Sequence, residues 1–263
     1  MARMYRHRQG SCGLAYGPTA ATMKPATPSL PASAAAHTTT TPPVFWALVL
    51  AFALLALVPT VWTDLDLAAA ALFMGDTPAI ASLQWAWVEA LNVWVPFTFR
   101  VALGLALLGW LWARLRAQRA RWRLPLAFVV LAGVAGPGLV VNLVFKDHWQ
   151  RARPYQVQDF GGTQQFTRAT IITNQCDNNC SFVSGHVACG VFLASLALVH
   201  RRRQMAWAVA GTGAGLAIAF ARMSDKAHWL SDVLWAFPIT LLTSWLVWKA
   251  LLWAYARPSR TVG

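Results

Sequence analysis

Long apolar segments separated by short polar segments dominate this chain. A bilayer core about 30 Å thick needs roughly 20 predominantly apolar residues for a helix to cross it. Six segments meet or approach this length and carry few or no charges. They cover residues 44–62, 91–113, 124–145, 182–199, 205–221 and 231–255. The pattern predicts an all-α polytopic membrane protein with six transmembrane helices.

The regions outside these segments complete the expected domain plan. Residues 1–42 are rich in Ala, Thr, Pro and Ser without an apolar period, so we expect a disordered cytoplasmic tail. Residues 43–256 would form the membrane domain, and residues 257–263 a short cytoplasmic tail. Residues 66–75 are apolar but too short to span, which favours a re-entrant or interfacial piece. No obvious small-residue cleavage site follows the first apolar segment, so we expect a retained helix there.

The composition agrees with a membrane location and adds an orientation. Hydrophobic residues make up 57% of the 263 residues and charged residues only 12%, whereas soluble domains are about 25% charged. The net charge is nevertheless +13. With six crossings, fourteen of the 22 Lys and Arg residues fall on the side that holds both termini, and six on the other side. The positive-inside rule then places both termini in the cytoplasm, and the basic loops indicate headgroup contact rather than nucleic-acid binding.

Two cysteines lie in the polar segment between the third and fourth apolar segments. Cys176 and Cys180 are separated by three residues. On the outer side of the membrane a disulfide between them is permitted, and the spacing allows this bond without requiring it. A metal site needs more ligands than the loop offers, so we expect no metal there.

The polar segments expected on the outer face share cations, imidazoles and a carboxylate. The stretch K-D-H-W-Q-R-A-R-P begins at Lys146 and contains Arg153. The stretch C-S-F-V-S-G-H ends at His186, and R-M-S-D-K-A-H-W-L-S-D begins at Arg222. Counting helices brings all three stretches to one membrane surface. The cations suit phosphate, because Lys and Arg bind phosphate oxygens and Arg does so in a planar fork.

The remaining residues of these stretches suit phosphoryl transfer. Ser184 and Gly185 precede a helix start, where free backbone N–H groups favour an anion. His228 and Asp232 are four residues apart and would share a helix face. An Asp that accepts from one imidazole nitrogen fixes the tautomer and leaves the other nitrogen free to attack. His186 is a second imidazole, available as a general acid. The set therefore predicts a phosphohistidine mechanism.

These motifs resemble a known family. The order K-x6-R-P from Lys146, S-G-H from Ser184 and R-x5-H-x3-D from Arg222 is similar to the type 2 phosphatidic acid phosphatase superfamily. The resemblance covers about residues 44–255. It implies a six-helix core with its active site at the outer face, and hydrolysis without a metal or another cofactor.

The resemblance also implies a role for each matched residue. His228 would attack phosphorus, and Asp232 would orient His228 and stabilise its charge. His186 would protonate the leaving oxygen. The phosphate would be held by Lys146, Arg153, Ser184, Gly185 and Arg222. Val183 and Ala221 depart from the family pattern, where Pro and Ser are usual, but neither change removes a predicted phosphate donor.

A finer resemblance concerns the substrate. The loop F-G-G-T-Q-Q-F over residues 160–166, followed by C-D-N-N-C-S-F-V-S-G-H, is similar to lipid A phosphatases, especially the 4′-phosphatase-like branch. This implies a lipid A substrate at the periplasmic face of a bacterial inner membrane. Phosphatases of undecaprenyl diphosphate, phosphatidylglycerophosphate or phosphatidate would use the same residues and stay open as alternatives.

A non-catalytic lipid or solute transporter on the same scaffold is an alternative of another class. Transport favours charges deep inside the spans, whereas these spans are nearly free of charges and Arg100 is the main exception. A soluble haloperoxidase-like role is disfavoured by the six apolar segments. No feature of the sequence indicates an oligomeric state.

Several polar and aromatic residues near the motifs are interpreted as ordinary surface residues. His148 and Arg151 lie at variable positions of the first motif, where they would meet water or headgroups. Asp225 and Lys226 are expected to form a solvated pair. Trp229 is expected in an interfacial aromatic belt.

Overall fold

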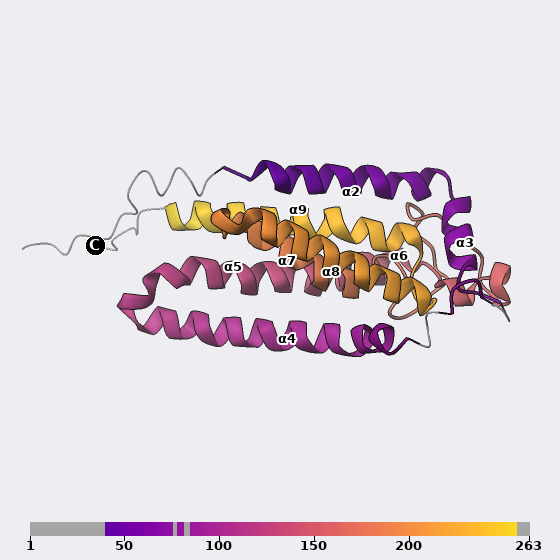
Figure 1. Ribbon diagram of the computed structural model, residues 1–263, viewed down its shortest axis with the longest axis horizontal. Helices are drawn as coiled ribbons and strands as arrows, with labels where there is room; N and C mark the ends of the chain where they lie inside the picture. Colours follow the sequence, from indigo (N-terminus) through magenta and orange to yellow (C-terminus); the bar gives the residue numbers. More distant parts are fainter. Residues whose placement is uncertain (1–39, 76–77, 82–84, 257–263) are drawn as a thin grey trace, which may run out of the picture.

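The computed structural model describes residues 40–75, 78–81 and 85–256, which form a bundle of long helices (Figure 1). The expected tail 257–263, and all but the last three residues of the expected tail 1–42, lie outside the described residues. Within the described residues, five helices are long and apolar enough to cross a membrane, and one further apolar segment, Gly185–Leu198, is shorter. The expected all-α, multi-pass fold is confirmed.

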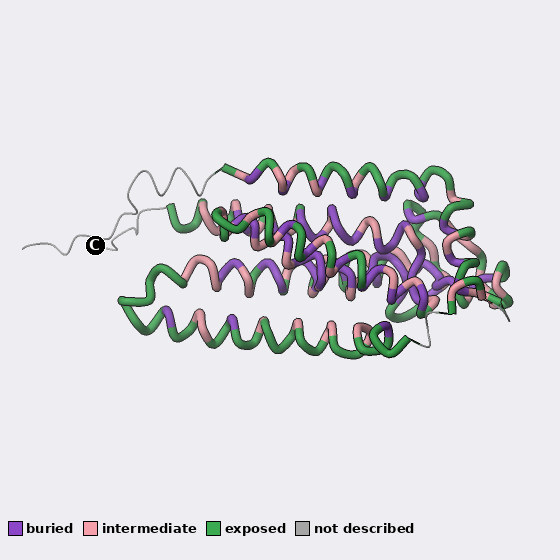
Figure 2. Tube along the Cα trace, in the orientation of Figure 1, coloured by how far each residue is buried: buried purple, intermediate pink, exposed green. Residues whose placement is uncertain are grey.

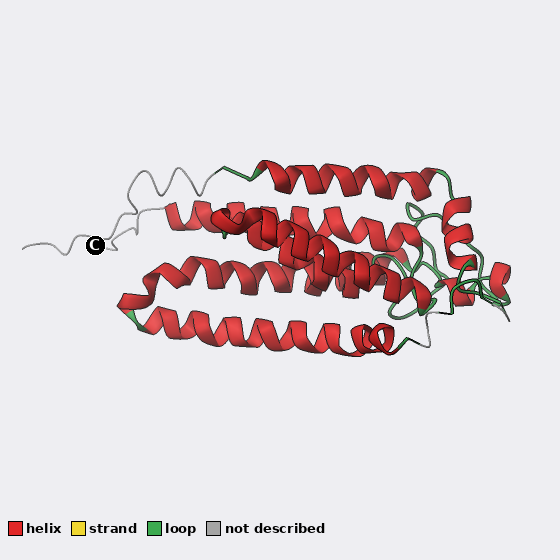
Figure 3. Cartoon of the chain, in the orientation of Figure 1, coloured by secondary structure: helices red, strands yellow, loops and turns green. Residues whose placement is uncertain are grey.

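The long helices lie roughly along one axis, and most of the loops, with several of the short helices, lie at one end of the bundle (Figure 3). The long elements are α2 (Pro43–Val61), α4 (Ala86–Leu115), α5 (Arg123–Gly133) with its continuation η3 (Val134–Lys146), α7 (Gly185–Ser195), α8 (Gln204–Ser224) and α9 (Leu230–Ala256). The short elements are α3 (Asp64–Ala71), η2 (Ala117–Trp122), α6 (Asp147–Trp149), η4 (Pro154–Gln156), η5 (Gln158–Phe160), η6 (Leu196–Leu198) and η7 (Arg201–Arg203). Helix α3 runs nearly crosswise at the loop-rich end, which agrees with the expected interfacial piece (Figure 1).

Helix α7 lies inside the bundle and packs most closely against α8. A Cβ added to Gly211 would lie 2.2 Å from the backbone nitrogen of Ala194, and one added to Gly190 would lie 2.6 Å from Ile218 Cδ1. Only glycine permits these approaches. The helix begins at Gly185, not at residue 182 as expected, because the backbone of Ser184 is extended and its N–H is directed at the Asp232 carbonyl, 3.4 Å away.

Helix α4 lies at the side of the bundle and buries few of its residues (Figure 2). Only Val88, Ala106 and Ala113 are buried along its length. Its exposed apolar surface includes Trp94, Leu105 and Leu108. Such a surface is stable in hydrocarbon rather than in water, so α4 presents most of its surface to lipid.

The third span changes from α-helix to π-helix at Val134. Pro137 lies within the π-helical part, where its missing N–H leaves one helical hydrogen bond unmade. The Asn142 side-chain amide donates to the carbonyls of Pro137 and Gly138 at 3.0 and 2.9 Å. Segments of this kind occur often at functional sites, and η3 ends at Lys146, the first residue of the predicted site.

Candidate active site

His228 is buried in the loop just before α9. Its Nδ1 lies 2.7 Å from the Ser181 carbonyl. A carbonyl oxygen only accepts, so Nδ1 carries the proton and Nε2 is left bare. Burial lowers the pKa of His228 to about 3; Asp232 opposes this shift, and the charges of Arg153 and Arg222 add to it. The imidazole is therefore neutral at physiological pH, as a nucleophile must be.

Asp232 lies beside this imidazole without accepting a hydrogen bond from it. Its Oδ2 is 3.7 Å from His228 Nδ1, beyond hydrogen-bonding distance. The carboxylate instead accepts the Trp229 N–H at 3.0 Å and a short hydrogen bond from the Ser181 hydroxyl. The expected shared helix face is wrong, because α9 begins only at Leu230. A turn brings the two residues together, and the Ser181 carbonyl fixes the tautomer.

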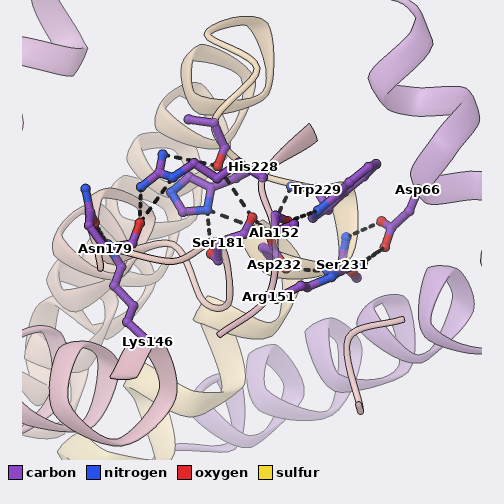
Figure 4. Close-up of polar contacts among 12 residues, drawn as sticks. Asp66, Lys146, Arg151, Ala152, Asn179, Ser181, His228, Trp229, Ser231 and Asp232 are labelled. Atoms are coloured by element: carbon purple, nitrogen blue, oxygen red, sulfur yellow. Dashed lines mark hydrogen bonds and ion pairs between the residues drawn. The ribbon is translucent and has the colours of Figure 1, made fainter. Parts of the chain in front are cut away.

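Two of the predicted phosphate ligands converge on Asn179 (Figure 4). Lys146 Nζ donates to Asn179 Oδ1 at 2.6 Å, and Arg153 Nε and Nη2 donate to the Asn179 carbonyl at 3.1 and 2.6 Å. Arg153 Nη1 also reaches the carbonyl of Ala227, next to His228, at 3.3 Å. These acceptors are neutral, so they position both cations without cancelling the charge that an anion would meet.

Asn92 of α4 connects two other predicted residues. His186 Nε2 donates to the Asn92 carbonyl at 3.1 Å, and Arg222 Nη1 donates to Asn92 Oδ1 at 3.1 Å. The same Arg222 nitrogen pairs with the Asp225 carboxylate at 2.8 Å. The expected solvated pair of Asp225 with Lys226 is therefore wrong, and Asp225 instead shares the charge of Arg222.

Two polar atoms at the start of α7 and the end of α8 are buried without a hydrogen-bond partner among the described residues. They are Ser184 Oγ and Arg222 Nε. A buried polar group left unpaired costs about 1–3 kcal/mol. Ser184 directly precedes α7, whose first N–H groups belong to Gly185 and His186. A phosphate group would satisfy these donors, since a helix N-terminus favours an anion.

Contacts therefore link most of the predicted site residues in pairs at the loop-rich end. Asn179 joins Lys146 to Arg153, and Asn92 joins His186 to Arg222. The Ser184 N–H reaches the Asp232 carbonyl at 3.4 Å. The sequence motifs gave no sign of either asparagine as a contact, although Asn179 lies within the C-D-N-N-C stretch.

Sequence reasoning also missed the role of Arg151, which is fully buried. Its Nη1 donates to Asp232 Oδ1 at 2.5 Å and to Ser231 Oγ at 2.8 Å. Its Nη2 pairs with Asp66 at 2.8 Å, and its Nε donates to the Thr167 carbonyl at 2.8 Å. The expectation of a loop residue in contact with water or headgroups is wrong. One signal was present: every charged residue between the first two apolar segments is acidic, Asp66 included, whereas cations predominate in the other polar segments expected on that face.

Trp229 and the two loop cysteines complete the surroundings. Trp229 is buried, not interfacial as expected, and its Nε1 donates to the Ala152 carbonyl at 2.9 Å. The Arg151 guanidinium lies 5.3 Å from its ring centroid, which is a cation–π distance. Cys176 and Cys180 are joined by a disulfide, and Asn179 lies within the loop that this bond closes.

A cavity of about 330 Å³ opens between α4, the third span and α7. Lys146, Gly185 and His186 line its polar end. Its remaining wall is mainly apolar and includes Phe99, Leu103, Val134 and Pro137, with Arg100 as the one further cation among its lining residues. The polar end is thus continuous with space shaped by apolar side chains.

Comparisons with known proteins agree with this geometry. Residues 122–256 match the model of the PAP2 superfamily. A lipid A 4′-phosphatase of Francisella tularensis subsp. novicida is 36% identical over 158 residues, which cover 59% of this chain and 70% of that protein. Lipid A 4′-phosphatases of Rhizobium leguminosarum and Rhizobium etli are 39% and 37% identical over 142 residues.

The two Rhizobium matches cover 53% of this chain and 58% and 52% of those proteins, so the chain spans little more than half their length. No solved structure is significantly similar to the chain. The family match covers half of the chain and contains the residues from Lys146 to Asp232 that form the site. The chain belongs to the PAP2 superfamily, the phosphatase superfamily that its motifs resemble.

Proposed function

We propose that this membrane phosphoric ester hydrolase removes a phosphate group from lipid A. The observation that carries the proposal is His228, a neutral imidazole with a bare Nε2 next to a carbonyl that Arg153 contacts. This nitrogen lies near cations, such as Arg153, that are held by neutral groups and keep their full charge. Such an arrangement suits attack on a phosphoryl group. The similarity to three lipid A 4′-phosphatases supports the choice of lipid.

In the first proposed step, His228 Nε2 attacks phosphorus and the bond from phosphorus to the lipid oxygen breaks. His186 gives the leaving oxygen a proton. His186 enters this step as an imidazolium with a proton on each nitrogen. Because the Asn92 carbonyl holds the proton on Nε2, Nδ1 is the nitrogen that delivers its proton. The imidazole of His228 gains positive charge, which Asp232 stabilises at short range. The charge on the phosphoryl oxygens is stabilised by Lys146, Arg153, Ser184, Gly185 and Arg222.

In the second step, water attacks the phosphohistidine. His186 Nδ1, now without its proton, takes a proton from the water. The nitrogen–phosphorus bond breaks, inorganic phosphate leaves, and His228 returns to its neutral form. The described side chains supply every proton transfer in this cycle.

The cavity supports a lipid as substrate. Its polar end shares Lys146 and His186 with the site, and its apolar wall lies between α4 and the third span. An acyl chain would occupy the apolar part while the phosphate sits at the polar end. The lipid would then enter sideways from the outer leaflet.

The proposed orientation places the active site at the periplasmic face and both termini in the cytoplasm. Helix α2 begins and α9 ends at the end of the bundle opposite the loop-rich end (Figure 1). The connections η2 and η7 contain five of the arginines assigned to the cytoplasmic side. The positive-inside rule supports this arrangement.

Purified protein incubated with lipid A tests the proposal, with released phosphate and the mass of the lipid as readouts. We expect lipid A to lose one phosphate, and the His228→Ala variant to bind lipid without releasing phosphate. Undecaprenyl diphosphate, phosphatidylglycerophosphate and phosphatidate are run in parallel. Turnover of one of these lipids, without turnover of lipid A, would identify that lipid as the substrate instead. No turnover of any lipid would overturn the proposed enzymatic function and favour a transporter.

A further inference from the structure

Asp66 lies in α3, outside the residues 122–256 that match the family, yet its carboxylate is fully buried against the site (Figure 4). Its Oδ1 accepts the Ser231 N–H at 2.7 Å. Its Oδ2 accepts the Ser231 hydroxyl at 2.5 Å and Arg151 Nη2 at 2.8 Å. Burial raises the pKa of Asp66, whereas the charge of Arg151 and the hydrogen bonds from Ser231 and Arg151 lower it. Three donors directed at its two oxygens are the partners of an ionised carboxylate, so we take Asp66 as ionised.

Arg151 connects this carboxylate to Asp232. One guanidinium pairs with both carboxylates at 2.8 and 2.5 Å, and all three side chains are fully buried. Its other bonds go to Ser231 Oγ and the Thr167 carbonyl. The planar fork of arginine fixes the direction of each bond, so a displacement of Asp66 is transmitted to the far side of the guanidinium.

The charges of the three residues do not cancel. With both carboxylates ionised, Asp66, Arg151 and Asp232 carry one net negative charge, whereas Arg151 and Asp232 alone would be neutral. Asp232 Oδ2 is 3.7 Å from His228 Nδ1. A positive charge that forms on His228 at this distance, in a buried site, is stabilised substantially more by a group of net charge −1 than by a neutral Arg151–Asp232 pair.

We propose that Asp66 is a positioning residue of the phosphatase reaction, which holds Arg151 so that Asp232 faces His228 as an uncompensated anion. The inference rests on the proposed phosphatase function. Asp66 does not touch the substrate. It acts when His228 gains positive charge, and therefore in the transition state more than in the bound ground state.

The substitution Asp66→Asn keeps the size of the side chain and an acceptor for the Ser231 N–H, but removes the charge. We expect kcat to fall about tenfold while KM changes less than about twofold, because the loss lies in the transition state. Asp64→Asn is the matched control, since Asp64 is an exposed carboxylate in the first turn of the same helix. It should leave kcat and KM unchanged.

Binding of two anions separates a catalytic effect from a general distortion of the site. Orthovanadate adopts the five-coordinate geometry of phosphoryl transfer when an imidazole binds it, whereas inorganic phosphate resembles the ground state. Asp66→Asn should weaken orthovanadate inhibition about tenfold and phosphate inhibition by less than about twofold. Equal weakening of both would mean that the site is distorted, and would overturn the proposal.

Asp66→Glu supplies a rescue variant, since it restores the charge on a longer side chain. We expect its kcat to lie between those of the wild type and Asp66→Asn. A folded Asp66→Asn protein with wild-type kcat would overturn the proposal. So would failure of both variants to give monodisperse protein, because Asp66 would then be structural. An inactive wild type would instead contradict the phosphatase function itself.

Discussion

The carbonyl oxygen of Ser181 accepts the Nδ1 proton of His228 at 2.7 Å. This bond determines which imidazole nitrogen is free, and it comes from the loop before α7, 47 residues away in the chain. The proposed nucleophile is thus oriented by a backbone group, while Asp232 lies close to it as a charge. A backbone carbonyl cannot be removed by substitution, so the experiments must address the imidazole itself.

Replacing His228 should abolish phosphate release and spare lipid binding. In His228→Ala no nitrogen is present to attack phosphorus, and we expect phosphate release to fall by about three orders of magnitude or more. Rapid quench of the wild type with a lipid labelled on its phosphate should trap label on the protein in an acid-labile form. The variant should trap none. Trapping of equal label in the variant would assign the covalent intermediate to another residue.

Acid should destabilise the folded protein through His228. In the unfolded chain its pKa is about 6.5, and in the folded protein it is about 3. Between these values the unfolded state binds the proton first, so the free energy of unfolding decreases as the pH falls from about 6.5 towards 3. Denaturant unfolding in detergent at several pH values measures this slope. His228→Gln should reduce the slope, and an unchanged slope would contradict a buried neutral imidazole.

A negative charge at Asn179 should weaken phosphate binding. Asn179→Asp places a carboxylate where a neutral side-chain amide now contacts Lys146 at 2.6 Å. The backbone carbonyl of the same residue holds Arg153. The new ion pair competes with the substrate for both cations, so kcat/KM should fall roughly tenfold to a hundredfold. Asn178→Asp is the control, because Asn178 is exposed and only its carbonyl contacts Cys176. Equal losses in both variants would point to a general charge effect.

Narrowing the cavity should discriminate between substrates by chain length. Gly138 lines the cavity, and a Cβ added there would contact only the Gly133 carbonyl, at 3.7 Å. Gly138→Leu would extend into the apolar part, so KM for a long-chain lipid phosphate should rise about fivefold while a short, water-soluble phosphate ester is unaffected. Gly104→Leu, at an exposed position of α4 with open space around it, should change neither. Equal effects on both substrates would show that the cavity does not bind the acyl chain of the lipid.

The fold and the family could be predicted because the information lies in local patterns. The spans follow from runs of apolar residues, and the order of the motifs at Lys146, Ser184 and Arg222 identifies the family by resemblance. The start of α7 could not be predicted, since Phe182 and Val183 continue the apolar pattern of the helix while the backbone N–H of Ser184 is directed at the Asp232 carbonyl. The prediction that His228 and Asp232 share a helix face was wrong for a similar reason: α9 begins only at Leu230, two residues after His228.

The network behind the site could not be predicted from local patterns. Asp66 and Arg151 are 85 residues apart, and nothing in either stretch states that α3 packs on the start of α9. In the sequence, both residues look like ordinary charged loop residues, because the sequence shows the charge of a side chain but not whether it is buried. The bonds of Asn92 in α4 and of Asn179 in a loop could not be predicted either, since a polar amide can bond to many partners.

The π-helical form of η3 makes the site sensitive to the length of this segment. Successive side chains on an α-helix are rotated by about 100°, and the wider π turn rotates them by less. The azimuth at which Lys146 leaves the segment therefore depends on how many residues adopt the wider turn. Exchange of one apolar residue for another there preserves this azimuth. Deletion of one residue rotates the lysine away from Asn179 without changing the hydrophobicity of the span, so the segment should vary in composition but not in residue count.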